Sequence, residues 1–342
     1  MTSENGSATV YAILSIAALS LLVAAASGPE IQAGVRLRAE EASSARDALL
    51  VDAVSGILEA LADDPTPLAD SMNDPVWDSV KALRTDGITI SLQDISSGFN
   101  LNAINPKWLE EPSFALYLNG TASASNICKQ RIIAFFSNQE DVKDYIAEDT
   151  LGSIFSLYGY VNPNTTDPET IAKYIEDRIE DTESAVMIAS DLSTAALSEI
   201  LYGKDVDRIL GPFKEKINPV VAPVPMINVN MAERKLLEIV LSLPYDNKGL
   251  KKSSEILDGL MADKLAGEVL PSDILSRIET ENTEDGGKLV LSFLGTTTWF
   301  WKITAVDQEG TSLTFIAARI PDFSEEDTMK FQVINKIWEN RI

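Results

Sequence analysis

The stretch SSGFNLNAINP at residues 96–106 places two asparagines, Asn100 and Asn102, where an extended apolar segment ends. The same Asn-x-Asn pair returns in PMINVNMAE at residues 225–233. An asparagine at the end of a strand can accept hydrogen bonds from the first free N–H groups of a following helix. We therefore predict that both pairs mark junctions where extended chain enters a helical module. The alternative is two unrelated turns, since asparagine is also common in turns.

Local patterns around both stretches predict helix caps. Glu233 follows Asn230 by three residues, which is a capping box with Asn in place of Ser or Thr. Asn105 precedes Pro106, the order expected of a cap followed by a first-turn proline. The residues predicted to have a structural, capping role are Asn100, Asn102, Asn228, Asn230 and Glu233.

Composition narrows the classes of function. The 342 residues suffice for two or three modest domains. The formal net charge of -24 repels phosphate backbones, so we expect no nucleic-acid partner. The chain has no histidine, the commonest general base, and its single cysteine, Cys128, cannot form an intramolecular disulfide. Nothing suggests a substrate pocket, so we predict that the protein is not an enzyme.

The N-terminus carries an apolar run. No charged residue occurs from Ala8 to Ala26, close to the ~20 residues that span a bilayer. Three interpretations fit: a secretory signal peptide, a plain membrane anchor, and a prepilin whose short leader ends in Gly6 and is cut before Ser7. The following residues favour the prepilin, because helical periodicity continues from Pro29 to a stop at DDPTP, residues 63–67.

The rest of the chain alternates between two periodicities. Residues 87–102 predict a half-buried strand, residues 106–285 show helical spacing, and residues 288–320 return to a period of two. The final segment SEEDTMKFQVINKIWEN has apolar residues at helical steps and predicts a last helix. Early and late strands with helices between them predict an α+β fold, in which a sheet carries a helical insertion.

These motifs together resemble the K-type minor pseudopilins of type II secretion, the general secretion pathway protein K family. The resemblance rests on SSGFNLNAI, IAKYIEDRIED, LSEILYGKDVDRILGPF, PMINVNMAERKLLEIV and TSLTFIAARI, which follow one another in the family's order over nearly the whole chain. It implies a pilin-like long N-terminal helix packed on a small antiparallel sheet, with a large inserted helical region of two SAM-like modules.

The resemblance also implies a division of the chain. The expected parts are a prepilin leader (1–6), a transmembrane segment and pilin helix (7–64), the first part of the pseudopilin sheet (76–105), a first (106–222) and a second (223–285) SAM-like module, C-terminal strands (286–321) and a C-terminal helix (322–342).

The function implied is that of a non-catalytic minor pseudopilin at the tip of the periplasmic pseudopilus. The protein would be a single-pass inner-membrane protein with its soluble part in the periplasm, processed by prepilin peptidase between Gly6 and Ser7. Its partners would be other minor pseudopilins. Tyr11 stands at the fifth mature position, where most pilins carry a glutamate that pairs with a neighbouring subunit. A subunit without that carboxylate suits the tip, where no subunit lies above it.

Two further interpretations accompany the resemblance. The resemblance implies calcium binding in the helical region, where EDRIEDTES concentrates acidic residues; the candidate ligands are Asp177, Glu180, Asp181 and Glu183. The alternative is a solvated acidic helix face. The alternative functions are a minor pilin of a related type IV pilus and a membrane-anchored helix-hairpin-helix DNA-binding protein. The DNA-binding hypothesis rests on INVN and on a small basic cluster around Gly249.

Overall fold

The computed structural model describes residues 44–66, 68–83, 87–119, 124–133, 136–162, 165–166, 170, 224–244, 249–282, 285–320 and 330–339. The chain divides into two compact units, Met1–Asp52 with Arg341–Ile342, and Ala53–Asn340. A helix covers residues 44–62, and its residues from Ala53 onward belong to the larger unit, which is described below. Within the described ranges, no helix is both long and apolar enough to cross a membrane. The predicted leader and membrane span lie outside these ranges.

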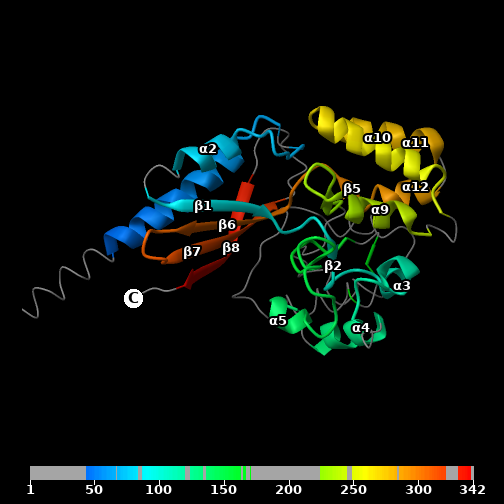
Figure 1. Ribbon diagram of the computed structural model, residues 1–342, viewed down its shortest axis with the longest axis horizontal. Helices are drawn as coiled ribbons and strands as arrows, with labels where there is room; N and C mark the ends of the chain where they lie inside the picture. Colours follow the sequence, from blue (N-terminus) through cyan, green and yellow to red (C-terminus); the bar gives the residue numbers. More distant parts are fainter. Residues whose placement is uncertain are drawn as a thin grey trace, which may run out of the picture. The chain divides into compact units, whose positions relative to one another are not determined.

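The larger unit contains a four-stranded antiparallel sheet of order β1-β6-β7-β8 (Figure 1). Its strands are β1 (Thr89–Asp94), β6 (Phe300–Val306), β7 (Ser312–Ile320) and β8 (Lys330–Glu339). β1 pairs with β6 from Thr89↔Val306 to Asp94↔Trp301, although the two strands lie far apart in the chain. This pairing confirms the prediction of an α+β fold in which early and late strands form one sheet with helices inserted between them.

One face of the sheet is covered by helices. In β1 the buried residues are Ile90 and Leu92, which alternate with exposed ones, so only one side of the strand is buried. Helix α2 (Val76–Leu83) places Trp77 edge-on against the fully buried Trp301, with ring centroids 6.4 Å apart. Val54, Ile57 and Leu61 of the first helix are also buried, so these apolar side chains pack inside the subunit.

The predicted C-terminal helix at 322–342 is wrong. Residues Lys330–Glu339 form strand β8, which pairs antiparallel with β7 over Ser312↔Glu339 to Ile320↔Lys330, with a register shift between Ile316 and Ala317. The residues that suggested a helix, Phe331, Ile334 and Trp338, are instead partly buried positions on a strand. The β7 backbone offered a hydrogen-bonding edge that a short run of apolar spacing could not reveal.

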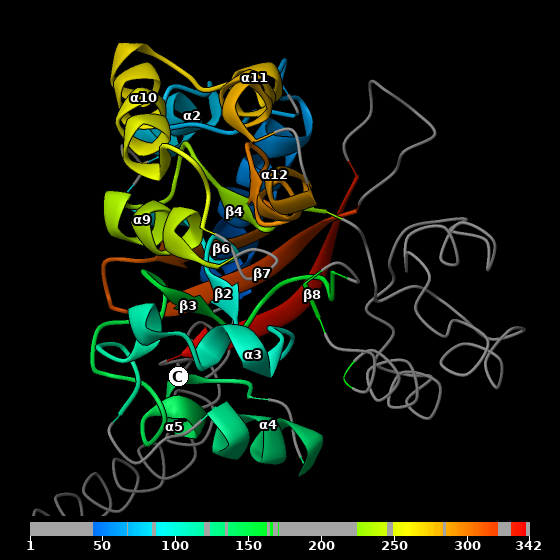
Figure 2. The same cartoon turned by 90° about the vertical axis from the view of Figure 1, so that its right-hand side faces the viewer.

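The insertion contains two helical modules, and each begins and ends with a two-residue strand. The first has β2 (Phe99–Asn100), α3 (Pro106–Leu109), η2 (Pro112–Phe114), α4 (Ala124–Ile133), α5 (Gln139–Val142) and β3 (Phe155–Ser156). The second has β4 (Ile227–Asn228), α9 (Arg234–Ser242), α10 (Ser253–Ala266), α11 (Pro271–Glu281), α12 (Asp285–Val290) and β5 (Leu294–Gly295). Figure 2 shows helices α3, α4 and α5 of the first module and α9, α10, α11 and α12 of the second.

The two modules share a hydrophobic core. Phe293 of the second module packs edge-on against Phe99 and Trp108 of the first, with ring centroids 5.7 and 5.8 Å apart. The second module also extends beyond its predicted end at residue 285, because α12 runs to Val290 and β5 then pairs with β4. The prediction that residues 286–290 belong to the C-terminal strands is therefore wrong.

Candidate functional site

The first Asn-x-Asn pair lies where β2 enters its module. β2 pairs in parallel with β3, and the Asn100 side chain accepts a hydrogen bond from the Asn102 N–H over 3.0 Å. The Asn102 side chain then binds the backbone of Phe136 at two points. Its Oδ1 accepts from the Phe136 N–H (2.8 Å) and its Nδ2 donates to the Phe136 carbonyl (2.9 Å). A side-chain amide thus takes the place of a strand partner for Phe136.

The second pair repeats this geometry. β4 pairs in parallel with β5, and Asn228 Oδ1 accepts from the Asn230 N–H over 2.9 Å. Asn230 binds the backbone of Val269, accepting from its N–H (2.8 Å) and donating to its carbonyl (2.9 Å). Since all four asparagines are buried and make matching contacts, the two modules are structural repeats, and each has its own junction of this kind, which we call an asparagine clamp.

The clamp differs from the predicted helix caps. The cap residue of α3 is Asn105, whose side chain accepts from the Lys107 N–H, which confirms the cap predicted there. The cap residue of α9 is Glu233, which makes no side-chain capping bond. The predictions that Asn102 and Asn230 cap the next helix, and that Glu233 completes a capping box, are therefore wrong. The side chains instead satisfy buried backbone groups of a distant segment, a stronger requirement than an exposed helix end.

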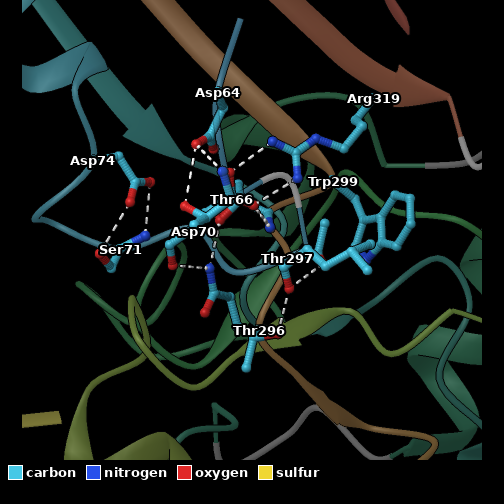
Figure 3. A network of polar contacts seen from close by, with 12 residues as sticks. Asp64, Thr66, Asp70, Ser71, Asp74, Thr296, Thr297, Trp299 and Arg319 are labelled. Atoms are coloured by element: carbon cyan, nitrogen blue, oxygen red, sulfur yellow. Dashed lines mark hydrogen bonds and ion pairs between the residues drawn. The ribbon is translucent and has the colours of Figure 1, made fainter. Parts of the chain in front are cut away.

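A buried ion pair joins the segment before α2 to the end of strand β7 (Figure 3). Arg319, at the end of β7, donates two hydrogen bonds to Asp70, of 2.6 and 2.7 Å, and neither side chain is exposed at all. Asp70 also accepts from the Thr298 N–H over 2.5 Å. A bidentate pair of this kind fixes the position of segment 68–74 against the end of the sheet.

The network continues to Asn228 of the second clamp and to Ser97, just before β2. Asn228 Nδ2 donates to the Asp70 carbonyl and to the Thr298 hydroxyl, each over 2.9 Å, and the Asn228 N–H donates to the Ser97 hydroxyl. The Ser97 hydroxyl in turn donates to Asp94, at the end of β1. We call this network of Asp70, Asp94, Ser97, Asn228, Thr298 and Arg319 the polar junction. It links the entrances of both modules to strands β1 and β7.

Three carboxylates, those of Asp64, Asp70 and Asp74, approach within 4.8 Å of one another near the junction. Such a group can hold a metal ion, but the donors here do not fit one. Both Asp70 oxygens already face Arg319, which supplies the compensating positive charge. Asp74 accepts from the N–H and the hydroxyl of Ser71, at 2.8 and 3.0 Å. The cluster is thus part of the structural network.

Burial shifts the pKa values of these carboxyl groups. Burial raises the pKa of Asp70 to about 7, although hydrogen bonds from Arg319 and Thr298 act in the opposite direction and lower that pKa. It raises the pKa of Asp74 to about 6, and the charges of Asp64 and Glu268 raise that pKa further. Burial also raises the pKa of Asp94. The folded state therefore favours protonated forms of these groups at pH values where the unfolded chain is ionised.

We expect the free energy of unfolding to fall as the pH rises from about 4 to about 6, since the folded chain then binds more protons than the unfolded chain. Replacing Asp74→Asn should reduce this dependence, because one of the three carboxyl groups with a raised pKa is removed while Asp70 and Asp94 remain. Asp78→Asn, which changes an exposed carboxylate, is the control. Urea denaturation at several pH values measures the effect, and an unchanged slope in Asp74→Asn would contradict it.

Several predicted site residues lie outside the described ranges. These are the processing pair Gly6 and Ser7 and the calcium candidates Asp177, Glu180, Asp181 and Glu183. The structure brings together Asn100 with Asn102, and Asn228 with Asn230. Sequence reasoning missed their backbone partners Phe136 and Val269, which carry no motif, and the Asp70–Arg319 pair, whose members are distant in the chain.

No protein-family model and no curated protein matches the chain. Among solved structures, the chain is similar to one from the crystal structure of the GspK-GspI-GspJ complex of the enterotoxigenic Escherichia coli Type 2 Secretion System. The identity is 14%, the match covers 90% of this chain and 99% of that chain, and the TM-score is 0.32. A similarity of this size does not define the fold.

Proposed function

We propose that the protein is a non-catalytic minor pseudopilin of a type II secretion system, which helps to initiate and cap the tip of the periplasmic pseudopilus. The pairing of β1 with β6 supports this most directly. Because β1 pairs with β6, the two helical modules lie in the sequence between the first strand and the later strands of one antiparallel sheet. That order agrees with the order of motifs through which the sequence resembles the K-type family.

The two asparagine clamps are evidence that the insertion consists of two modules of the same kind. Asn102 and Asn230 make the same pair of backbone contacts, and each follows a parallel two-residue ladder. This repetition is consistent with the two SAM-like modules that the resemblance implies. An insertion of such size would obstruct further stacking of subunits, which suits a place at the tip.

A role without catalysis agrees with the chemistry of the polar junction. The carboxylates of Asp70 and Asp94 accept hydrogen bonds from neighbouring serine, threonine and arginine groups, so they act as structural acceptors. The alternative of DNA binding gains little from the basic cluster, since Lys252 pairs with Glu255 over 3.6 Å. We expect docking to other minor pseudopilins through the apolar residues of segment 31–61, other than Val54, Ile57 and Leu61, which are buried within the subunit.

Processing of the N-terminus tests the proposal. We expect the chain isolated from membranes of cells with prepilin peptidase to begin at Ser7, and Gly6→Leu to leave the leader uncut. Ser3→Ala, also in the leader, should be processed normally. Mass spectrometry of the N-terminal peptide measures this. A wild-type chain that still begins at Met1, or that is cut near Ala26, would contradict the proposal.

The position in the fibre is tested separately. Immunogold labelling of assembled fibres should place the protein at one end, because Tyr11 has no charged group that could pair with a subunit above it. Label spaced along the whole shaft would rule out the tip position and leave a subunit used throughout the fibre.

A further inference from the structure

Three carboxyl groups meet where the segment before α2 passes the end of the first helix (Figure 3). Asp70 is fully buried and Asp74 is 7% exposed, and Asp64 lies beside them, just beyond the helix. An oxygen of each group lies within 4.8 Å of an oxygen of the other two. Negative charges this close together and shielded from water oppose one another's ionisation, so such a cluster favours a bound proton.

The positive charge beside the cluster is matched to one of the three groups. In the described ranges Arg319 is the cationic group that bonds to the cluster, and both of its hydrogen bonds go to Asp70. Two other elements add negative charge around them: Glu268 belongs to the turn between α10 and α11, and Asp94 lies at the end of β1. The negative charges therefore outnumber the positive one, and the surplus falls on Asp74, to which no described cation is bonded.

Asp74 closes a short loop that contacts two other elements. Its carboxyl group accepts from the N–H and the hydroxyl of Ser71, which folds residues 71–74 back on themselves. On one side of the loop, Trp77 Nε1 of α2 donates to the Ser71 carbonyl over 2.8 Å. On the other side, the Asn73 side chain donates to the Gly267 carbonyl of the second module over 3.5 Å. The loop thus touches the second module through a contact that depends on its closed form.

We propose that residues 71–74 form a latch between the sheet and the second module, which is closed when Asp74 carries a proton and opens when the proton is lost. Loss of the proton places a new negative charge opposite Asp64 and Glu268, and the loop moves away from them into water. Asp70 keeps its ion pair with Arg319, so the loop stays attached at its sheet end. The inference does not depend on the proposed function, which concerns the order of the sheet and modules and the N-terminus.

The direction of the pH effect follows from burial. Burial, with the charges of Asp64 and Glu268, raises the pKa of Asp74 to about 6 in the closed loop, whereas a carboxyl group exposed in the open loop has its ordinary value of about 4. The closed form therefore binds the proton more tightly than the open form. The stability of the closed loop is complete below about pH 4 and is lost as the pH rises through about 6.

Hydrogen exchange of the full chain in detergent tests the latch. Exchange is followed by mass spectrometry at pH 5 and pH 8 in the wild type and in Asp74→Asn, after correction for intrinsic rates. Asparagine has the shape of the protonated carboxyl group and cannot ionise, so it keeps the latch closed at both pH values. Asp78→Asn is the matched control, since it removes the same charge from an exposed position of α2.

The exchange rate of residues 69–77 in the wild type, divided by that in Asp74→Asn, should rise about ten-fold from pH 5 to pH 8. The same ratio for α9 should not change, because its buried helix does not take part. A ratio for residues 69–77 that is equal at both pH values would overturn the proposal. An equal rise in α9 would also overturn it, because the whole subunit and not the loop would then be opening, as would an Asp78→Asn variant that behaves like Asp74→Asn.

Discussion

Replacing Arg319→Met should lower the free energy of unfolding of the full chain by about 3–5 kcal/mol. Arg319 and Asp70 are both completely buried, and the guanidinium makes two hydrogen bonds to the carboxylate. Methionine fills a similar space but leaves the Asp70 carboxylate with no positive charge beside it. The measurement is urea denaturation near pH 8, where Asp70 of the wild type is ionised, monitored by tryptophan fluorescence.

A surface ion pair provides the control for this prediction. Arg234 and Asp258 lie 2.6 Å apart, but their side chains are 53% and 62% exposed. Arg234→Met should therefore change the free energy of unfolding by at most about 1 kcal/mol. If Arg319→Met costs no more than Arg234→Met, the polar junction does not hold segment 68–74 to the sheet.

Features governed by local chemistry could be predicted from the sequence. The alternation of Ile88, Ile90 and Leu92 indicated β1, and it is the strand that pairs with β6. Asn105 and Pro106 indicated the start of α3, where Asn105 does cap the helix. In both cases the residues that decide the structure are neighbours in the chain, so their spacing carries the information.

Features governed by distant partners could not be predicted. β8 is a strand because the backbone of β7 pairs with it, and the apolar spacing of Phe331, Ile334 and Trp338 gave no sign of that edge. Arg319 stands in a motif that the resemblance singled out, yet nothing near Asp70 marks it as the partner. Repetition was the one signal available for the clamps: it located the two junctions but not the residues they bind.

Truncating either clamp should have nearly the same large effect. We expect Asn102→Ala and Asn230→Ala each to lower the free energy of unfolding by about 2–4 kcal/mol, because each leaves a buried N–H and a buried carbonyl without their partner. Those groups belong to Phe136 in the first module and Val269 in the second. Urea denaturation of the two variants, followed by far-ultraviolet circular dichroism, measures both losses.

Substitution by aspartate shows whether the hydrogen-bond pattern is the cause. Aspartate keeps the shape of asparagine and can still accept from the N–H of Phe136 or Val269, but its second oxygen faces a carbonyl that needs a donor. Asn102→Asp and Asn230→Asp should therefore destabilise at least as much as alanine at neutral pH, and recover partly when acid protonates the new carboxyl group. Asn105→Ala, at the exposed cap of α3, should cost only about 1 kcal/mol. Aspartate variants as stable as the wild type would show that shape alone holds the clamp, and a loss at only one of the two sites would contradict the structural repeat.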